Sequence, residues 1–539
     1  MFSKIINGQS KTITGAAIII GGATLISRLV GLARDRIFAH SFGAGQVMDA
    51  YYAAFKIPDL VYNLLILGAL TAGFIPVFIK IYEKDENKQA AWKFVNNIIN
   101  IIGVAIIALC GLGIIFAPHL SSIIAPGFGE EAKNFTAQFT RIMFLSPILL
   151  GFSMTFGGVL QSLRRFAAYS LAPIFYNLGI IAGTVILFPI IGATGLAWGV
   201  VLGALLHFIL QAYAARKAGF RWRWEFNLKD KETWLVGKLM IPRALGLALN
   251  QVSIFVVTIL ASLLPSGSVS VYNFANNLQA VPIGIIGIPF ALAVFPALSS
   301  AAAENNKEKF IQNLSSTTRQ ILFLVIPCSI LILLLRAQIV RVVLGSGAFD
   351  WNATIATADA LALFSLSLFS QSLIPLFARA FYSISNTKTP FIIGMIAELI
   401  GIIAALILMK PLGVAGLALA FSCASIINFS ILTIALRQTL KGMDEENLLN
   451  FIFRVIIAGI VMAIIVQILK YPLAAIFNQQ YLWGILGQGF IAGSAGLVIY
   501  GFLCYILKVP EFMQFKDSFK KKWLRLKNVQ PAEIMEGKE

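Results

Sequence analysis

Charged side chains are scarce in this chain of 539 residues, making up 12% of it, whereas a soluble globular chain carries roughly 25%. Hydrophobic residues make up 58%, and the mean hydropathy is +0.84. Apolar blocks of roughly 20 residues recur from end to end, and each is long enough as a helix to cross a hydrocarbon core of about 30 Å. These features predict an all-α integral membrane protein, because no alternating barrel pattern is present.

Cysteine and histidine are also rare. The four cysteines lie inside apolar blocks without a Cys-x-x-Cys pair, and the three histidines are scattered. We therefore expect no disulfide framework, no metal site and no cofactor. The chain also lacks a nucleophile elbow, a phosphate-binding loop and an aspartate-rich motif in an aqueous loop. An enzyme such as a polyprenyl-phosphate glycosyltransferase is disfavoured, and a membrane transporter is expected instead.

The net charge of +18 is carried by short loops between the apolar blocks, so no soluble domain presents a face for nucleic acid. The most basic loop reads "ARKAGFRWRWEFNLKDKE", whereas loops such as "PSGSVS" and "GSGAFDWN" carry no Lys or Arg. Positive loops stay on the cytoplasmic side of a membrane. This asymmetry predicts a multi-pass protein of the cytoplasmic membrane with an even number of spans and both termini cytoplasmic.

The apolar pattern predicts about fourteen transmembrane helices. They cover 13–41, 49–81, 91–117, 136–163, 167–189, 192–215, 233–264, 269–300, 316–345, 353–383, 388–409, 412–438, 450–470 and 482–507. The first six form an N-lobe over 13–215, the next six form a C-lobe over 233–438, and two extra helices occupy 450–507. Residues 508–539 form a basic cytoplasmic tail.

An internal repeat supports the two lobes. "PIIGATGLAWGVVLG" aligns with "KPLGVAGLALAFSCA", which places Gly192 and Gly195 opposite Gly413 and Gly416 at an offset of 413 − 192 = 221 residues. Six helices separate the copies, so the two lobes enter the membrane in parallel orientation. Such lobes typically enclose a central site that opens alternately to either side. A static helical bundle is the alternative.

The first span carries charges at membrane depth. Arg28 and Asp35 lie on nearly one helix face, Arg34 is about a third of a turn away, and Asp49 opens the next span. Charged residues inside a membrane face protein or water, because each costs about 2.5–3.5 kcal/mol in lipid. The functional interpretation is a cationic cavity for an anionic head group, since guanidinium binds phosphate oxygens with paired hydrogen bonds. The alternative is an internal ion-pair network that only fixes the first two helices.

Polar residues also stand inside later spans. Asn250 and Asn277 are amides that either line a wet cavity or bridge helices. Glu398 is an isolated carboxylate that is either kept neutral by burial or takes part in ion coupling. Ser422 and Asn428 on the next span are candidates to complete such a site. Transport coupled to a cation or to the membrane potential is therefore one hypothesis.

The stretch "SRLVGLARDRIFAHSFGAGQVMDAYYAAFKIPDL", followed by "GALTAGFIPVF", resembles the MurJ (MviN) family of bacterial lipid II flippases. That family lies within the multidrug/oligosaccharidyl-lipid/polysaccharide exporter superfamily. The resemblance implies that an undecaprenyl-pyrophosphate-linked peptidoglycan precursor is moved from the inner to the outer leaflet, in cell-wall biogenesis and the maintenance of cell shape. It also implies that Arg28, Arg34 and Asp49 match residues of the family's cavity, and that other cell-wall synthesis proteins are candidate partners.

The sequence departs from the family pattern where arginines and glutamates are typical. The positions concerned hold Tyr62, Asn63 and Leu67 after "KIPDL", and Asn276, Asn277 and Ala280 in the eighth span. The resulting cavity is less cationic than that of a typical member. Two alternatives therefore stay open. One is an exporter of another lipid-linked glycan or of an amphipathic small molecule, and the other is a non-transporting scaffold of a cell-wall synthesis complex.

Overall fold

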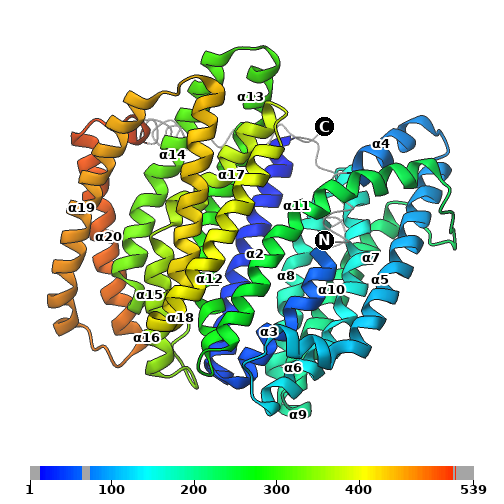
Figure 1. Ribbon diagram of the computed structural model, residues 1–539, viewed down its shortest axis with the longest axis horizontal. Coiled ribbons are helices and arrows are strands. Elements are labelled where there is room, and N and C mark those ends of the chain that lie inside the picture. Colours follow the sequence, from blue (N-terminus) through cyan, green and yellow to red (C-terminus); the bar gives the residue numbers. More distant parts are fainter. Residues whose placement is uncertain (1–12, 64–72, 514–515, 517–539) are drawn as a thin grey trace, which may run out of the picture. The chain divides into compact units, whose positions relative to one another are not determined.

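The computed structural model describes residues 13–63, 73–513 and 516, and contains helices and connecting turns with no β-strand among those residues (Figure 1). The elements are, in chain order, α2 (Ile13–Phe42), α3 (Gln46–Tyr62), α4 (Ile75–Lys84), α5 (Gln89–Ile124), α6 (Glu130–Met143), α7 (Leu145–Ser162), α8 (Phe166–Ala182), η3 (Gly183–Leu187), α9 (Phe188–Ile191), α10 (Thr194–Lys217), α11 (Lys231–Ser262), α12 (Ser268–Pro282), η4 (Ile283–Gly287), α13 (Ile288–Ala303), α14 (Lys307–Leu334), α15 (Arg336–Val343), α16 (Trp351–Ser365), α17 (Leu368–Ser383), α18 (Lys388–Leu440), α19 (Glu445–Ile476) and α20 (Leu482–Ile506). Here η denotes a π-helix.

Many of these helices are long and apolar enough to cross a membrane. In the described ranges nine helical segments meet that condition, and a tenth does if the bent pair α16 and α17 counts as one span. The prediction of an all-α membrane protein is confirmed. The number of fourteen spans stays a prediction.

The pair α16 and α17 is bent by 46° in the middle of the predicted span 353–383. Serine hydroxyls hold the carbonyl groups at this bend, because Ser365 donates to the carbonyl of Ala362 at 2.6 Å and Ser367 donates to that of Phe364 at 3.1 Å. Such side-chain bonds replace the backbone bonds that a continuous helix would make. The bend is therefore stabilised locally without proline or glycine.

The repeated glycines adopt matching backbone conformations. Gly192 has φ 67° and ψ −154°, and Gly413 has φ 56° and ψ −133°, where side-chain-bearing residues are rare. Gly195 and Gly416 each lie against the backbone seven to eight residues earlier, leaving no room for a Cβ atom. The repeat that the sequence predicts is thus a repeated sharp turn in the structure.

Glycines also bring α8 and η3 close to α10. A Cβ atom on Gly179 would overlap the backbone of Gly203, and one on Gly183 would overlap the backbone of Gly199. Small residues are common between membrane helices because they permit close van der Waals packing where lipid supplies no hydrophobic driving force.

The chain divides into two compact units. Unit 1 comprises the described residues up to Leu278 with Val343–Ala360 and Glu398–Ala420, and unit 2 comprises Gln279–Val342, Leu361–Ala397 and the described residues from Phe421 onward. The boundaries fall inside α12, α15 and α16 and twice inside α18. The predicted lobes 13–215 and 233–438 stay a prediction.

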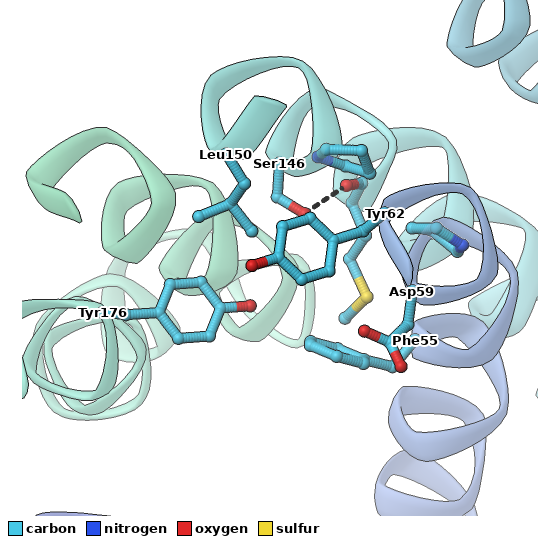
Figure 2. Close-up of a pocket in the computed structure, with 9 residues that line it drawn as sticks. Phe55, Asp59, Tyr62, Ser146, Leu150 and Tyr176 are labelled. Atoms are coloured by element: carbon cyan, nitrogen blue, oxygen red, sulfur yellow. Dashed lines mark hydrogen bonds between the residues drawn. The ribbon is translucent and has the colours of Figure 1, made fainter. Parts of the chain in front are cut away.

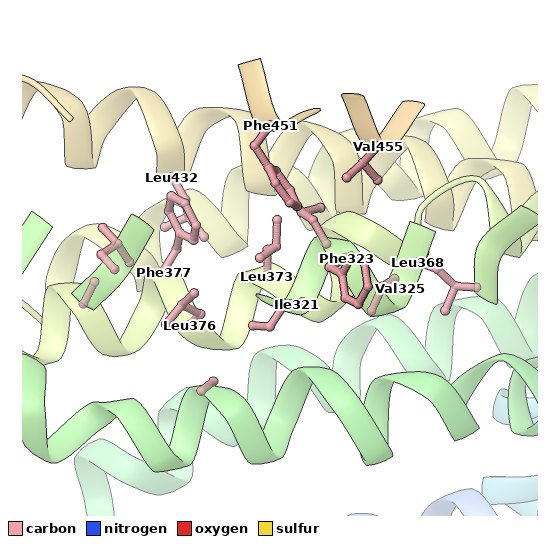
Figure 3. Packing of buried hydrophobic residues seen from close by; sticks show 14 of the residues in the cluster. Ile321, Phe323, Val325, Leu368, Leu373, Leu376, Phe377, Leu432, Phe451 and Val455 are labelled. Carbon is pink, nitrogen blue, oxygen red and sulfur yellow. The ribbon is translucent and has the colours of Figure 1, made fainter. Parts of the chain in front are cut away.

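Each unit has an apolar core of its own. In unit 1 the stacked rings of Phe74, Phe78 and Phe94 join α4 to α5. In unit 2 the core lies between α14, α17, α18 and α19, where Phe323, Phe377 and other buried side chains pack together (Figure 3).

Candidate functional site

Asp35 lies at the centre of a polar cluster in unit 1 and is only 3% exposed. Arg34 next to it donates to Asp35 Oδ1 through Nη2 at 2.8 Å and through Nε at 3.0 Å. Asn277 of α12 donates to the other carboxylate oxygen at 2.9 Å. The Nη1 group of Arg34 donates to Oδ1 of Asn177 in α8 at 3.0 Å. The structure thus brings together the predicted residues Arg34, Asp35 and Asn277.

A second contact joins α3 to α12 one helical turn away from Asn277. Lys56 donates from Nζ to Oδ1 of Asn273 at 3.0 Å, and Asn273 in turn donates to the carbonyl of Val269 at 2.7 Å. Because residues four apart lie on one helix face, Asn273 and Asn277 form a polar stripe on α12. This stripe meets a cation of α3 and a carboxylate of α2.

Asp49 fixes the start of α12. Its Oδ2 accepts the backbone N–H of Gly267 at 2.6 Å, and its Oδ1 accepts the backbone N–H of Ser270 at 2.7 Å and also the Ser270 hydroxyl. A carboxylate is well placed there, since the first N–H groups of a helix lack backbone partners and carry partial positive charge. These bonds give the 2%-exposed Asp49 a structural role. A direct role in a substrate cavity stays a prediction.

Arg28 lies half-buried on α2, seven residues before Asp35 and therefore about 10 Å along the helix axis. Gly31 lies between them, and a Cβ atom there would approach Asn177 Oδ1 to only 4.0 Å. A substrate role for Arg28 stays a prediction.

A small pocket opens beside this cluster in unit 1. Asp59 and Tyr62 of α3, Ser146 of α7 and Tyr176 of α8 line it, and the two tyrosine hydroxyl groups point into the same space (Figure 2). Asp59 accepts a hydrogen bond from Asn63 at 2.9 Å. At the two positions where a typical family member has arginines, this chain has the phenol of Tyr62 and the amide of Asn63.

The residues proposed for ion coupling belong to both units of the chain. Glu398 belongs to unit 1. Ser422 belongs to unit 2, where it donates to the carbonyl of Leu363 at 2.7 Å and accepts from Ser367 at 2.9 Å. Within the described chain, Oδ1 of Asn428 is buried and accepts no hydrogen bond.

No group of three or more His, Cys, Asp or Glu residues is arranged to hold a metal ion in the part of the chain that the structure describes. The side chain of Asn250 and all of Leu67 lie outside the described residues, as does most of the predicted basic tail. Ion coupling through Glu398, Ser422 and Asn428 stays a prediction.

The cluster is close to neutral as a whole. Its three cations are Arg28, Arg34 and Lys56, and its three carboxylates are Asp35, Asp49 and Asp59. Arg34 makes three of its five possible N–H hydrogen bonds to Asp35 and Asn177, so its guanidinium is oriented inside the protein and still has donors left over. Such exchangeable polar contacts suit a site that alternates between an empty and a loaded form.

Sequence reasoning missed two residues of the cluster. Asn177 is a lone amide in the apolar segment "IFYNLGII", and Ser270 lies in a loop-like "SGSVS". Burying an unpaired amide in lipid costs free energy, so an amide inside a span indicates a polar partner. Asn177 could have been found on that ground. For Ser270 no comparable signal exists.

Solved structures of low sequence identity share this fold. A multidrug resistance transporter of the MATE family, in an inward-facing conformation, matches 79% of this chain and 98% of its own at a TM-score of 0.65 and 15% identity. A lipid II flippase MurJ in an inward closed conformation matches 91% of this chain and 98% of its own, at a TM-score of 0.76 and 24% identity. This chain therefore shares its fold with these two proteins, the first of which is a transporter of the MOP superfamily.

The sequence comparisons are more specific. The family model described as "Lipid II flippase MurJ" matches residues 38–487. A protein of Buchnera aphidicola subsp. Schizaphis graminum, named probable lipid II flippase MurJ, is 31% identical over 460 residues, which cover 84% of this chain and 89% of that relative. The chain therefore belongs to the MurJ family, and the resemblance found in its first two spans is confirmed.

Proposed function

We propose that this protein is a lipid II flippase, which moves the undecaprenyl-pyrophosphate-linked peptidoglycan precursor from the inner to the outer leaflet of a bacterial cytoplasmic membrane. Membership of the MurJ family and its match over 38–487 support this proposal. The observation that carries it is the cluster in which Arg34 is held by Asp35 and Asn177. A guanidinium so oriented at membrane depth is suited to a phosphate group.

The protein acts as a transporter and not as a catalyst. The head group enters a cavity lined by Arg28 and Arg34, and its phosphates take over the hydrogen bonds that Asn177 and Asp35 accept from Arg34. Closing the cavity on one side and opening it on the other then delivers the head group across the membrane. Both termini are cytoplasmic in this arrangement.

Directed transport requires a bias between the inward and outward states, because a ligand shifts an equilibrium only by its differential affinity. A cation gradient or the membrane potential supplies that bias. Glu398 is the candidate for sensing a cation, since it is the isolated carboxylate of its span. An experiment with imposed gradients in vesicles tests this assignment, and Glu398→Gln should abolish the response to the coupling ion without abolishing lipid binding.

A second candidate function is export of a different lipid-linked glycan. It is favoured by Tyr62 and Asn277, which stand where typical family members carry arginine. Competition between lipid II and polyprenyl-monophosphate-linked glycans for the purified protein separates the two functions. Preferential binding of the monophosphate would contradict lipid II as the substrate.

The direct test is the leaflet accessibility of labelled lipid II in proteoliposomes. We expect Arg28→Ala to reduce flipping at least about tenfold, the effect of losing one charge-assisted hydrogen bond. Lys93→Ala is the matched control, because the Lys93 side chain is 70% exposed and lies outside the cluster. Flipping by folded Arg28→Ala protein at the unmutated rate would overturn the proposed cavity.

A further inference from the structure

A polar cleft in unit 2 lies far along the sequence from the cluster around Arg34. It has a volume of about 760 Å³ and is lined by Gln312 and Arg319 of α14, by Asp444, Asn447 and Arg454 around the start of α19, and by Pro510. Ligand-binding sites usually occupy about 300–1,000 Å³. The cleft is therefore large enough for a head group of a small amphiphile.

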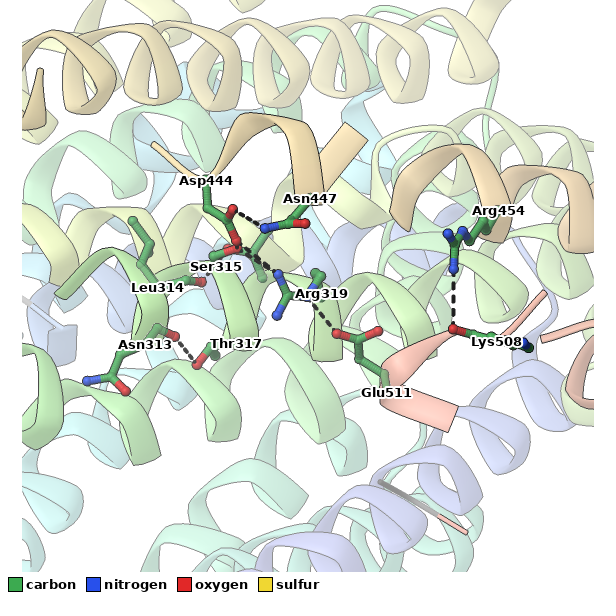
Figure 4. A network of polar contacts seen from close by, with 11 residues as sticks. Asn313, Leu314, Ser315, Thr317, Arg319, Asp444, Asn447, Arg454, Lys508 and Glu511 are labelled. Atoms are coloured by element: carbon green, nitrogen blue, oxygen red, sulfur yellow. Dashed lines mark hydrogen bonds and ion pairs between the residues drawn. The ribbon is translucent and has the colours of Figure 1, made fainter. Parts of the chain in front are cut away.

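An ion triad of Arg319, Asp444 and Glu511 contributes its first two members to the wall of this cleft, and Figure 4 shows its contacts. Arg319 donates through Nε to Glu511 at 2.6 Å and through Nη1 to Asp444 at 3.2 Å. Two carboxylates against one guanidinium leave one net negative charge. The Glu511 side chain is only 3% exposed, and its Oε2 accepts no hydrogen bond from a described residue. This wall therefore favours a cationic group over an anionic one.

Arg454 supplies the opposite charge in the lining of the cleft. Its Nη1 donates to the carbonyl groups of Leu507 at 2.9 Å and Lys508 at 3.3 Å. Among the described residues its Nε and Nη2 groups have no hydrogen-bond partner, although guanidinium offers five N–H donors in a planar fork. Arg454 therefore retains donors for a phosphate group.

The position of Arg454 along α19 lets its side chain reach the phosphate layer of a membrane. The helix has 32 residues, which gives a length of about 48 Å, whereas the hydrocarbon core is about 30 Å thick. Arg454 lies nine residues after Glu445, about 14 Å from the start of the helix. An arginine at that depth is stable when its long side chain reaches phosphate groups at the interface.

An apolar stripe continues from the cleft along the same helix. Leu449 and Phe453 are 66% and 67% exposed, and Ile456, Ile460 and Ile464 follow at helical spacing, each about half exposed. Such a face lies against acyl chains in a membrane. A polar cleft with a guanidinium and an adjoining apolar stripe has the outline of a phospholipid site.

We propose that this cleft binds a phospholipid of the phosphatidylethanolamine class. The phosphodiester is bound by Arg454, the primary ammonium is directed toward Asp444 and Asn447, and the acyl chains follow the stripe that begins at Leu449. The net negative charge of the triad disfavours an anionic head group such as phosphoglycerol. A quaternary choline group is disfavoured as well, because it cannot donate hydrogen bonds to carboxylate or amide oxygens.

The test uses the full-length protein purified in detergent, with phosphatidylethanolamine, phosphatidylcholine and phosphatidylglycerol of identical acyl chains. Native mass spectrometry measures which lipid is retained, and thermal unfolding measures stabilisation by each lipid. We expect phosphatidylethanolamine to be retained about tenfold more than the other two, the effect of one hydrogen bond between charged groups. Equal retention of the three lipids would overturn the proposal.

Asn447→Lys is the decisive variant. Asn447 is exposed and donates to Asp444 Oδ1 at 2.7 Å, so a lysine there keeps a bond to Asp444 while it reverses the charge that the ammonium meets. We expect the preference to change from phosphatidylethanolamine to phosphatidylglycerol. Gln438→Lys is the control, because it adds the same charge at an exposed position outside the cleft. An unchanged preference in Asn447→Lys would contradict the proposed orientation of the head group.

Arg454→Gln tests the phosphate contact. We expect it to weaken retention of all three lipids, since each contains the phosphodiester. Because Arg454 also holds the carbonyl groups of Leu507 and Lys508, its variant needs an intact unfolding transition before lipid retention is compared. If that variant does not fold, the change of preference in Asn447→Lys decides the proposal alone.

Discussion

Arg34 in α2 donates a hydrogen bond to Asn177 in α8, 143 positions further along the chain, at 3.0 Å. The same guanidinium binds Asp35 through its other nitrogen atoms. The arginine assigned to substrate binding is thus held in a defined orientation by neutral and charged acceptors. In the proposed function, an incoming phosphate therefore meets a guanidinium that already has partners.

The pairing of Arg34 with Asp35 allows structural and functional roles to be separated. Arg34→Ala leaves a carboxylate with a 4% exposed side chain without its cation, which should destabilise the protein by about 3 kcal/mol. Arg34→Ala combined with Asp35→Asn removes that stranded charge. We expect the double variant to regain most of the stability but not the flipping of lipid II. Thermal unfolding in detergent and the leaflet assay measure the two properties.

If the double variant recovers both stability and flipping, Arg34 only balances the charge of Asp35. If it recovers neither, the defect arises from the packing of α2 and not from charge.

Asn277→Arg restores a charge that is typical of the family at a position bonded to Asp35. The added guanidinium should raise the affinity for a pyrophosphate-linked lipid about tenfold, as expected for one additional charge-assisted hydrogen bond. Binding of lipid II and of a monophosphate-linked analogue to the purified protein measures the effect. Equal gains for both ligands would indicate general attraction of anions, and no gain would place Asn277 outside the binding site.

The glycine contact between α8 and α10 should be sensitive to a single methyl group. A Cβ atom on Gly203 would overlap the carbonyl of Tyr176, whose side chain lines the pocket beside Asp59. We expect Gly203→Ala to cost about 1–3 kcal/mol, the range for overpacking. Gly111→Ala is the matched control, because no neighbouring atom lies within 4 Å of its Cβ position. Equal unfolding temperatures of the two variants would contradict the close contact.

Asp444 should make the stability of unit 2 depend on acidic pH. Burial alone raises its pKa, but hydrogen bonds from Ser315 and Asn447 and the charge of Arg319 outweigh burial and hold the pKa below its usual value. A carboxyl with a lowered folded-state pKa contributes stability that is complete above an unfolded-state pKa of about 3.9 and is lost as pH falls through the folded-state pKa. The temperature of thermal unfolding, measured from pH 7 downward, should therefore fall below about pH 4. In Asp444→Asn that part of the decline should be absent.

Features that depend on local sequence were predictable. The apolar blocks locate most helices, and the repeated glycines at Gly192 and Gly413 mark sharp turns because only glycine adopts that backbone conformation readily. The helix α14 begins at Lys307, although the apolar pattern starts near 316, because its first turns are polar and lie at the cleft beside α19. Helices extend past the apolar block where such polar partners exist.

Which helices pack side by side was less predictable. Most side chains of α8 are apolar around the whole helix, so the pattern does not indicate which face meets α2. Asn177 indicates that a polar partner exists but does not identify it as Arg34. The bend between α16 and α17 also lacks the proline or glycine that usually indicates one, since serine hydroxyls stabilise it. The family resemblance identified Arg28, Arg34 and Asp49 but did not indicate that Asp49 would hold the start of α12.

The hydrogen bond between Asp49 and Ser270 can form only after residue 270 has been synthesised, long after Asp49. The two residues are 221 positions apart, and a ribosome that adds about 5–20 residues per second needs about 10–45 s to span that distance. During this interval a carboxylate that ends up 2% exposed has none of its three hydrogen-bond donors. The nascent α3 therefore has to keep Asp49 hydrated or protonated until α12 emerges.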